Sequence, residues 1–327
     1  MDKTITYIKR KSLPHYHSIE GLFNSIKTEV SKSNETDLVY TKHSGGSPLT
    51  MLKNYLAFDK AKNTIYHITG DVHYMALVTG KRTVLTVHDI GSALEGTILK
   101  RLYIKLFWFW LPALVVKRIT VISEFTKQEL TQIIPFAKHK IEVIPNSVST
   151  SFSQKHYTFN QQCPTILCVG TKSNKNLERI ITGVVDINCK LHIIGELTSK
   201  QLELLNHFKI NYQNSSNLEQ EDIVKAYEAC DMLCFPSTYE GFGMPIIEAQ
   251  SVGRPVLTSN YGALLEVAKE SACLVDPYNI EAIKVGIEQL ISNANYRDTL
   301  INNGFENVKR FHLETIVKQY LSIYNQL

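Results

Sequence analysis

Short apolar runs alternate with amphipathic stretches along the 327 residues of the chain. Six runs in the first half predict strands, at residues 4–8, 37–40, 63–69, 82–87, 118–122 and 141–145. Six more follow in the second half, at residues 165–169, 191–194, 210–212, 232–235, 255–258 and 273–275. Alternating strand and helix patterns predict an α/β protein with two doubly wound parallel sheets. A stretch rich in Ser, Thr and Gln near residue 150 indicates the linker, which gives domains at 1–150 and from 151 onward.

The most informative pattern is DMLCFPSTYEGFGMPIIE, at residues 231–248. An apolar strand leads into a loop with two glycines, and Pro245 marks the first turn of a helix. Such a helix start presents backbone N–H groups and a positive dipole end to an anion, most often a phosphate. Glu240 and Glu248 bracket the turn and can accept hydrogen bonds from paired sugar hydroxyls. Phosphate donors beside hydroxyl acceptors indicate a sugar nucleotide, although a glycine turn and a first-turn Glu also occur without any ligand.

Polar side chains follow the strands at the edge where open α/β sheets hold their ligands. Asp71 and His73 follow the third predicted strand, and His88 and Asp89 follow the fourth. A His-Asp pair there can transfer protons or bind phosphate, and it can equally cap the strand. In the second half, Lys172 and Lys175 follow strand 165–169. They could reach a diphosphate as point charges, or be solvated surface lysines.

Charge is unevenly distributed between the two halves. Residues 1–150 hold 20 Lys and Arg against 12 Asp and Glu, whereas the remainder holds 15 against 19. The basic first half predicts an anionic partner, such as a membrane surface or a phosphorylated acceptor. The sequence contains no nucleic-acid recognition motif and no basic run, so nucleic-acid binding is not predicted. The aromatic, basic helix expected at 100–112 fits a membrane interface, but a core helix is the more common explanation.

Two further patterns concern the compartment. No apolar run reaches the roughly 20 residues of a membrane span, and the charged N-terminus differs from a signal peptide. All six cysteines lie in the second half, without a C-x-x-C pair. Buried reduced thiols are therefore expected in preference to disulfides or zinc ligands. We expect a cytoplasmic protein, with a peripheral position at the inner face of the membrane as an option.

Several of these motifs together resemble family 4 of the retaining glycosyltransferases. Glu240 and Glu248 match the E-x7-E signature of that family, and Val169-Gly170 with Lys175-Asn176 matches its first donor loop. Flanking matches are Val87-His88-Asp89, Val121-Ile122-Ser123, Val143-Ile144-Pro145-Asn146, Gly253-Arg254-Pro255-Val256 and Leu274-Val275-Asp276-Pro277. The resemblance implies the GT-B architecture, in which two Rossmann-like domains face each other across a cleft. It also implies that residues from about 311 to 327 cross back from the second domain, 151–310, to the first.

The resemblance implies a role for each matching residue. His88, Glu240 and Lys175 would be catalytic: beside the transferred sugar, at its hydroxyls, and at the departing diphosphate. Glu248 would hold the ribose of a UDP- or GDP-linked sugar. The remaining donor contacts would come from Phe242, Gly243, Met244, Gly170, Thr171 and Lys172. Asp71, His73, Asp89 and Gly21 are candidates for the acceptor side. Neither a metal nor another cofactor is expected, because positive side chains and a helix end take their place.

The sequence departs from the family pattern at two points. Many members carry Arg where Gly170 stands, and many have a Gly-Gly pair in the first loop, where only Gly21 appears. The expected activity is retaining transfer of a hexose to a surface glycan, an oligosaccharide or a lipid-linked acceptor, as in polysaccharide biosynthesis. The alternatives are another GT-B enzyme, such as an epimerase or a phosphorylase, and a non-catalytic nucleotide-sugar-binding subunit.

Overall fold

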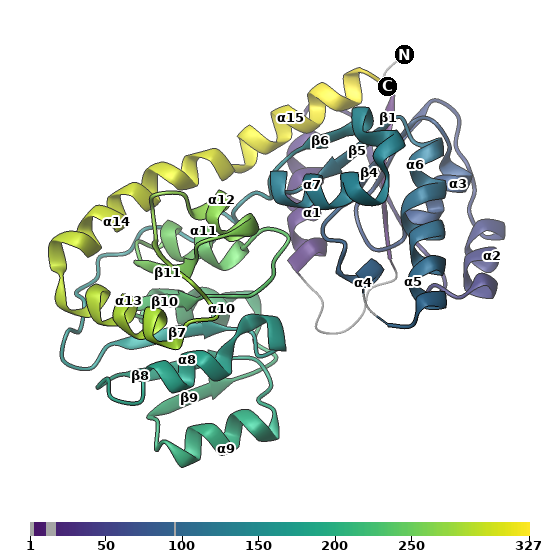
Figure 1. Cartoon of the computed structure of the whole chain (residues 1–327). Coiled ribbons are helices and arrows are strands. Elements are labelled where there is room, and N and C mark those ends of the chain that lie inside the picture. Colours follow the sequence, from purple (N-terminus) through teal and green to yellow (C-terminus); the bar gives the residue numbers. More distant parts are fainter. Residues whose placement is uncertain (1–2, 11–17, 95) are drawn as a thin grey trace. The chain divides into compact units, whose positions relative to one another are not determined.

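The computed structural model describes residues 3–10, 18–94 and 96–327. The chain divides into two compact units (Figure 1). Unit 1 comprises Met1–Ser147 with Leu313–Leu327, and unit 2 comprises Val148–His312. The sequence-based division was 1–150 with about 311–327, and 151–310.

Unit 1 is built on a six-stranded parallel sheet with the order β2-β1-β3-β4-β5-β6. The strands are β1 Thr4–Lys9, β2 Thr36–Tyr40, β3 Thr64–Ile68, β4 Thr83–Val87, β5 Arg118–Val121 and β6 Ile141–Val143. The helices are α1 Ser18–Val30, α2 Pro48–Leu56, α3 Ala76–Thr79, α4 Gly91–Leu94, α5 Ile98–Ile104, α6 Leu111–Val115, α7 Glu124–Ile133 and α15 Leu313–Asn325. Short helical turns are η1 His73–Met75, η2 Lys105–Trp110 and η3 Pro135–Lys140.

The two faces of the unit 1 sheet bury separate cores. Ile5 and Tyr7 point to the face covered by α1 and α15, whereas Ile8 points to the opposite core. This division follows from the two-residue period of a strand. Both faces are apolar because the strands are parallel and covered on both sides by helices. The carboxyl ends of β1, β3 and β4 remain at one edge, where the polar side chains collect.

The helix expected at 100–112 is longer and contains an irregular turn. It runs from α5 through η2, which is a π-helix, into α6. Pro112 has no N–H to donate and its ring clashes with a regular helical turn. The Leu111 N–H instead donates to the Leu106 carbonyl, five residues back, which is the π spacing. Trp108 and Phe109 in this turn are buried, so this part of the helix is core, as the more common explanation proposed.

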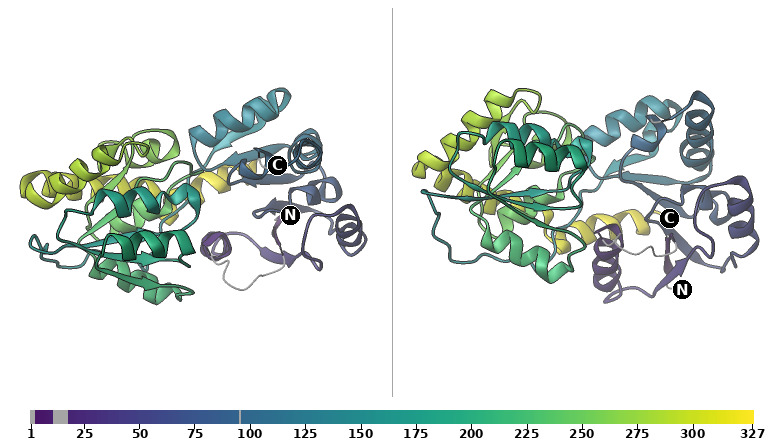
Figure 2. Two further views of the ribbon diagram at one scale, coloured as in Figure 1. Left: turned by 60° about the horizontal axis from the view of Figure 1, so that its bottom comes forward. Right: turned by 90° about the horizontal axis from the view of Figure 1, so that it is seen from below.

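Unit 2 is built on a second six-stranded parallel sheet with the order β12-β11-β10-β7-β8-β9. The strands are β7 Thr165–Val169, β8 Lys190–Ile194, β9 Tyr212–Ser215, β10 Met232–Phe235, β11 Val256–Ser259 and β12 Cys273–Val275. The helices are α8 Leu177–Gly183, α9 Ser199–His207, α10 Gln220–Ala229, α11 Met244–Ser251, α12 Gly262–Ala268, α13 Ile280–Ser292 and α14 Ala294–Val308, with turns η4 Ser173–Lys175 and η5 Lys309–Phe311. Helices lie on both faces of this sheet, as the further views in Figure 2 show.

Two local expectations were wrong. The strand expected at 210–212 is β9, at Tyr212–Ser215, because its pairing with β8 runs from Tyr212 opposite Leu191 to Ser215 opposite Ile194. Gly21 was expected in the loop before the first helix, but it lies inside α1. The apolar residues Leu22, Phe23, Ile26 and Val30 already follow helical spacing, and they carry Gly21 into the helix.

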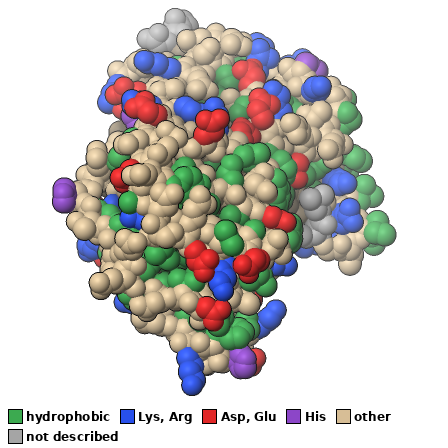
Figure 3. Space-filling view, turned by 60° about the vertical axis from the view of Figure 1, so that its left-hand side comes forward, with side chains coloured by type: hydrophobic (Ala, Val, Ile, Leu, Met, Phe, Trp, Pro, Cys, Tyr) green, Lys and Arg blue, Asp and Glu red, His purple; other side chains and the backbone are tan. Residues whose placement is uncertain are grey.

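The remaining structural features are the surface charge, the cysteines and the lengths of the apolar helices. On the face drawn in Figure 3, acidic and basic side chains are interspersed. Cys163 is partly exposed and the other five cysteines are buried, and all six are free thiols. Among the described residues, no helix combines the length and the apolarity that a membrane crossing needs.

Candidate functional site

The loop after β10 leads into α11 in the conformation that the sequence predicts. Gly243 is the N-cap of α11 with φ 116°, and a Cβ at this position would lie 2.6 Å from Cδ2 of Leu264. Only glycine fits such a position. The cap makes no side-chain hydrogen bond, and Pro245 stands in the first turn. The amino end of α11 therefore keeps its positive dipole end available for an anion.

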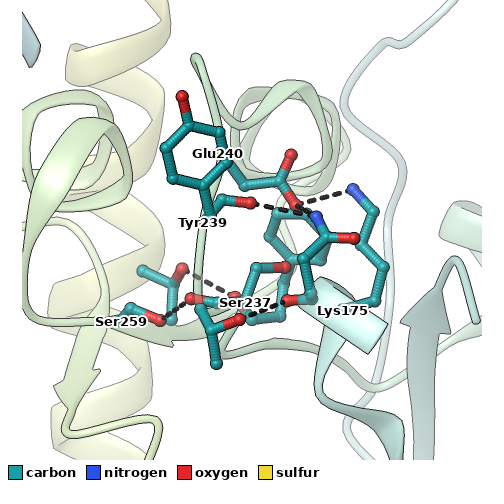
Figure 4. A network of polar contacts seen from close by, with 9 residues as sticks. Lys175, Ser237, Tyr239, Glu240 and Ser259 are labelled. Atoms are coloured by element: carbon teal, nitrogen blue, oxygen red, sulfur yellow. Dashed lines mark hydrogen bonds and ion pairs between the residues drawn. The ribbon is translucent and has the colours of Figure 1, made fainter. Parts of the chain in front are cut away.

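Lys175 and Glu240 form an ion pair between the two loops of unit 2 (Figure 4). Nζ of Lys175 lies 2.7 Å from Oε1 of Glu240, and the side chains are 21% and 16% exposed. Asn174 strengthens the junction, since its Nδ2 donates to the Tyr239 carbonyl at 3.0 Å and to Oε1 of Glu240 at 3.3 Å. Nζ also lies 4.8 Å from the centroid of the Phe235 ring. A cation and a carboxylate are thus held together near the end of β10.

Gly170 explains how the lysine reaches this position. It has φ +90°, and an added Cβ would lie 2.9 Å from Cγ of Lys175 and 3.0 Å from its Cε. The aliphatic stem of Lys175 therefore passes directly over the glycine. Thr171 donates to the Glu196 carbonyl at 2.6 Å and is partly buried. Lys172 is exposed.

Glu248 lies in α11 and is held by a buried tyrosine. The hydroxyl of Tyr227, on α10, donates to Oε2 of Glu248 at 2.6 Å. Burial raises the pKa of Glu248 to about 7, against smaller lowering effects of the Tyr227 hydrogen bond and the Lys175 charge. Burial also raises the pKa of Tyr227, and the Glu248 charge adds to it. Glu248 therefore changes its charge near neutral pH, while Tyr227 stays a hydrogen-bond donor.

In unit 1, His88 follows β4 and is partly buried. Its Nε2 lies 3.0 Å from the Thr69 carbonyl, which can only accept a hydrogen bond. Nε2 therefore carries the proton. Burial lowers the pKa of His88, so the ring is neutral at neutral pH and Nδ1 is left as an acceptor. The ring of Phe23 packs edge-on against it, with the centroids 5.9 Å apart.

The other polar residues at this sheet edge lie around His88. His73 is buried in η1, and its Nδ1 donates to the Trp108 carbonyl at 2.9 Å. Burial lowers its pKa, while Asp71 and Asp89 act in the opposite direction. Asp71 accepts from Nε1 of Trp108 at 2.8 Å, and Asp89 accepts from the Gly91 N–H at 2.9 Å. The structure thus brings Asp71, His73, His88 and Asp89 within electrostatic reach of one another.

The remaining candidate residues differ in how far they are exposed. The Phe242 side chain is buried against Phe311, with the ring centroids 5.5 Å apart, so only its backbone is available to a ligand. Met244, the first residue of α11, is partly exposed. Gly21 is exposed in α1, and none of the described atoms lies within 4 Å of a Cβ built at this position.

Three residues of the site were missed by sequence reasoning. Asn174 ties the two loops together, and Tyr227 holds Glu248. A tyrosine on the buried face of a helix needs a partner for its hydroxyl, and that signal pointed to a nearby acceptor. The hydroxyl of Ser237 is buried with no hydrogen-bond partner within the described part of the chain. Its loop position is evident in Figure 4, but sequence alone does not distinguish it from an ordinary loop serine.

Arg254, from the matched Gly253-Arg254-Pro255-Val256 element, is structural. The residue is 1% exposed, and its guanidinium donates to the carbonyls of Cys230, Val252 and Glu228. It also stacks on Tyr157 at 3.8 Å from the ring centroid. Arg254 therefore links the end of α10 to the segment that precedes β11.

The chemistry available in unit 2 suits a charged, hydroxyl-rich ligand. Lys175 and the amino end of α11 can neutralise the charge of a diphosphate, and Glu240 and Glu248 can accept hydrogen bonds from hydroxyl groups. In the described ranges, no group of three His, Cys, Asp or Glu side chains is placed to hold a metal ion.

Both halves of the chain match known protein families. The model of the "Glycosyltransferase Family 4" domain matches residues 36–152, and the model of "Glycosyl transferases group 1" matches residues 150–307. The two matches overlap at residues 150–152 and together span residues 36–307, which include most of both units. The chain belongs to the family 4 glycosyltransferases.

Individual relatives of this glycosyltransferase match parts of its length. The O-antigen chain mannosyltransferase B of Escherichia coli is 36% identical over 107 residues, which are 33% of this chain and 28% of the relative. An uncharacterized glycosyltransferase of Methanocaldococcus jannaschii, MJ1178, is 27% identical over 255 residues, 75% of this chain and 68% of the relative. The first of these alignments thus spans less than a third of the relative's length.

The fold of the glycosyltransferase agrees with solved structures over its whole length. The structure of HepE from Anabaena, in complex with UDP and glucose, superposes with a TM-score of 0.78 and 14% identity. The match covers 99% of this chain and 100% of the other. The fold is therefore GT-B, with two Rossmann-like units, as the resemblance implied.

Proposed function

We propose that this glycosyltransferase moves a hexose from a nucleoside-diphosphate sugar to a glycan or lipid-linked acceptor, with retention of the anomeric configuration. The observation that carries the proposal is the Lys175–Glu240 pair beside Glu248 and the amino end of α11. Phosphate-neutralising and hydroxyl-accepting groups are thereby gathered in one unit. The solved structure of HepE with UDP and glucose supports the choice of donor class.

Glu248 is the ribose ligand in this proposal. Its carboxylate accepts from both ribose hydroxyls when it is ionised, and the Tyr227 hydroxyl fixes its second oxygen. Because the pKa of Glu248 is raised to about 7, donor affinity should rise between about pH 6 and pH 8. The backbone of Phe242, Gly243 and Met244 meets the diphosphate at the start of α11.

Lys175 exchanges partners during the reaction. Without a ligand, its ammonium is neutralised by Glu240 at 2.7 Å. A bound diphosphate takes over Lys175 and leaves Glu240 to accept hydroxyls of the transferred sugar. When the bond from C1 to the diphosphate breaks, negative charge grows on the departing phosphate. Lys175 and the helix end stabilise that charge more strongly than they stabilise the ground state.

The remaining donor contacts come from the first loop of unit 2, where Gly170 and Thr171 approach the diphosphate with their backbone and Lys172 adds positive charge. His88 contacts the transferred sugar through Nδ1, which is the acceptor nitrogen of the neutral ring. Asp71, His73 and Asp89 serve the acceptor. The reaction needs neither a metal nor another cofactor, since Lys175 and the helix end supply the positive charge.

A peripheral contact with an anionic membrane is a further part of the proposal. On α5, Ile98 and Leu99 are 81% and 80% exposed, and basic Lys100 and Arg101 follow directly. Apolar and basic side chains side by side suit an anionic lipid surface. In flotation with anionic vesicles at low salt, the protein should rise with the vesicles, and Ile98→Ser with Leu99→Ser should remain behind. Failure of the unchanged protein to float would rule out this contact.

Product stereochemistry tests the reaction itself. NMR of the first product from a UDP- or GDP-hexose should show the anomeric configuration of the donor. Lys175→Ala should lower turnover by about 100-fold, the usual effect of removing one charge-stabilising group. Lys200→Ala, an exposed lysine on α9, is the matched control and should leave turnover unchanged. Inverted product, or equal turnover in Lys175→Ala, would contradict the proposal.

A further inference from the structure

Unit 1 contains a small cavity at the edge of the polar cluster. Its volume is about 280 Å³, and it is lined by Gly46, Asp71, Lys100, Tyr103, Ile104 and Trp108. The walls are therefore aromatic and aliphatic, with one carboxylate and one ammonium group. Asp71 belongs both to this cavity and to the cluster around His88.

The cavity wall is a built feature. Tyr103 donates to the Gly46 carbonyl at 2.6 Å, and the Trp108 indole donates to Asp71 at 2.8 Å. A Cβ on Gly46 would lie 2.2 Å from Cη2 of Trp108, so the indole occupies the space that any other residue would need. Trp108 stands in the π-helical turn η2, and such turns are frequent at functional sites.

We propose that this cavity binds a glycosyl unit of the acceptor. A pyranose ring presents an apolar face of C–H groups and a rim of hydroxyls, which match the aromatic wall and the polar groups respectively. The indole N–H takes one of about four acceptor positions on the Asp71 carboxylate, and the others can receive sugar hydroxyls. Lys100 can donate to a hydroxyl oxygen.

The chemistry of the cavity favours a neutral sugar over a nucleotide or a phosphate. Its two charged groups, Asp71 and Lys100, have opposite signs, so the cavity holds no excess of positive charge. Its volume suits a single ring. Asp71 lines the cavity and also interacts electrostatically with His73 and His88. Because His73 and His88 serve the transfer in the proposed function, on which this inference rests, the sugar bound in the cavity belongs to the acceptor.

The chain offers a direct probe, because Trp108 and Trp110 are its two tryptophans. In Trp110→Phe, the emission comes from Trp108 alone. Titration with the methyl glycosides of mannose, glucose and N-acetylglucosamine should change this emission saturably for at least one sugar. Trp108→Phe, which keeps Trp110, is the control and should not respond. No response in Trp110→Phe to any of the three, or an equal response in Trp108→Phe, would overturn the proposal.

Two substitutions test the polar contacts in the Trp110→Phe background. Asp71→Asn keeps an oxygen for the indole N–H but loses the charge, and should weaken sugar binding about tenfold or more. Lys100 is exposed, so Lys100→Ala should fold normally and also weaken binding. Asp59→Asn, an exposed carboxylate elsewhere in unit 1, is the matched control. Unchanged affinity in both Asp71→Asn and Lys100→Ala would place the sugar elsewhere.

A free and a lipid-linked acceptor share this sugar chemistry. An octyl glycoside below its micellar concentration should bind more tightly than the methyl glycoside if a lipid continues along the exposed Ile98 and Leu99, and equally if it does not. Both results support the cavity. Nucleotide-induced thermal shifts on the same variants separate the two proposals. A nucleotide response without a sugar response contradicts the cavity alone, and the reverse contradicts only the proposed function.

Discussion

The buried carboxylate of Glu248 is suited to binding a ligand, but its burial lowers the stability of the protein without ligand. It lies partly buried in α11, with the Tyr227 hydroxyl at 2.6 Å. Burial penalises its charged form, and the Tyr227 hydrogen bond and the Lys175 charge do not compensate for this effect. A ligand that donates two hydroxyl hydrogen bonds would relieve this penalty.

The raised pKa gives a signed prediction for stability. The pKa of Glu248 is about 7 in the folded protein and near 4.5 in the unfolded chain. The stability that this group contributes is present below pH 4.5 and is lost as the pH rises through about 7. Glu248→Gln stays neutral, so its unfolding free energy relative to the unchanged protein should rise between pH 5 and pH 8, by up to about 3 kcal/mol. Urea unfolding at both pH values measures this.

The matched control for that experiment is Glu203→Gln, which changes an exposed glutamate on α9. Its stability relative to the unchanged protein should not vary with pH in this range. A flat pH dependence for Glu248→Gln as well would show that the Glu248 carboxyl is not desolvated in solution.

Gly170 gives a second prediction at the residue scale. With φ +90° and Lys175 directly above it, Gly170→Ala strains the backbone and displaces the lysine stem. We expect a loss of about 1 kcal/mol in stability and, from the displaced ammonium, a fall in turnover of about tenfold. Gly183→Ala is the control, because its nearest neighbours lie at 3.5 Å and beyond. Equal turnover in Gly170→Ala and the unchanged protein would show that the position of the Lys175 ammonium does not matter for catalysis.

At the scale of elements, α15 is fixed to unit 1 through a buried polar network. Its Tyr324 hydroxyl lies 2.6 Å from Nδ1 of His67 on β3, and Nε2 of His67 lies 2.7 Å from Oγ1 of Thr86 on β4. Burial lowers the pKa of His67 to about 3, so the ring is neutral and both nitrogens need partners. The helix is thereby joined to two neighbouring strands.

Removing that contact should loosen the last helix. Tyr324→Phe leaves Nδ1 of buried His67 without its partner, which should cost about 1–3 kcal/mol of unfolding free energy. Tyr40→Phe, at an exposed position on β2, should change it by less than about 0.5 kcal/mol. Chemical denaturation compares the two variants. A Tyr324→Phe protein as stable as the Tyr40→Phe protein would show that packing alone holds α15.

Sequence patterns predicted most elements because parallel strands and their helices carry strong periodic signals. An apolar run, two glycines and Pro245 were enough to predict β10, the glycine turn and α11. The π turn η2 did not follow, since it results from how Pro112 fits a continuous helix. The β9 strand was misplaced because its polar sequence, YQNS, has no apolar period and its bounds come from pairing with β8.

The candidate site could be predicted from the sequence as residue types but not as contacts. The pattern identified Glu240, Glu248 and Lys175, yet it did not predict that Lys175 and Glu240 pair, because that depends on the two loops meeting through Asn174. It also missed Tyr227, which comes from a different helix. Such partners depend on tertiary packing, which local spacing does not record.

At the scale of the whole molecule, charge and chemistry are divided between the two units. The first half is basic and the second half acidic by the counts of the sequence. Unit 1 holds the histidine and aspartate cluster with the aromatic cavity, and unit 2 holds the lysine, the two glutamates and the helix end. This division supports a donor site in unit 2 and acceptor contacts in unit 1.

The most direct test of the account is thermal unfolding with UDP, GDP, ADP, TDP and their sugar conjugates, with and without EDTA. One nucleotide at a hundredfold excess over its dissociation constant should stabilise the fold by about 2.7 kcal/mol. We predict that this shift survives EDTA and disappears in Glu248→Ala, while Glu203→Ala retains it. A shift that requires a metal, or that persists in Glu248→Ala, would contradict metal-free donor binding at Glu248.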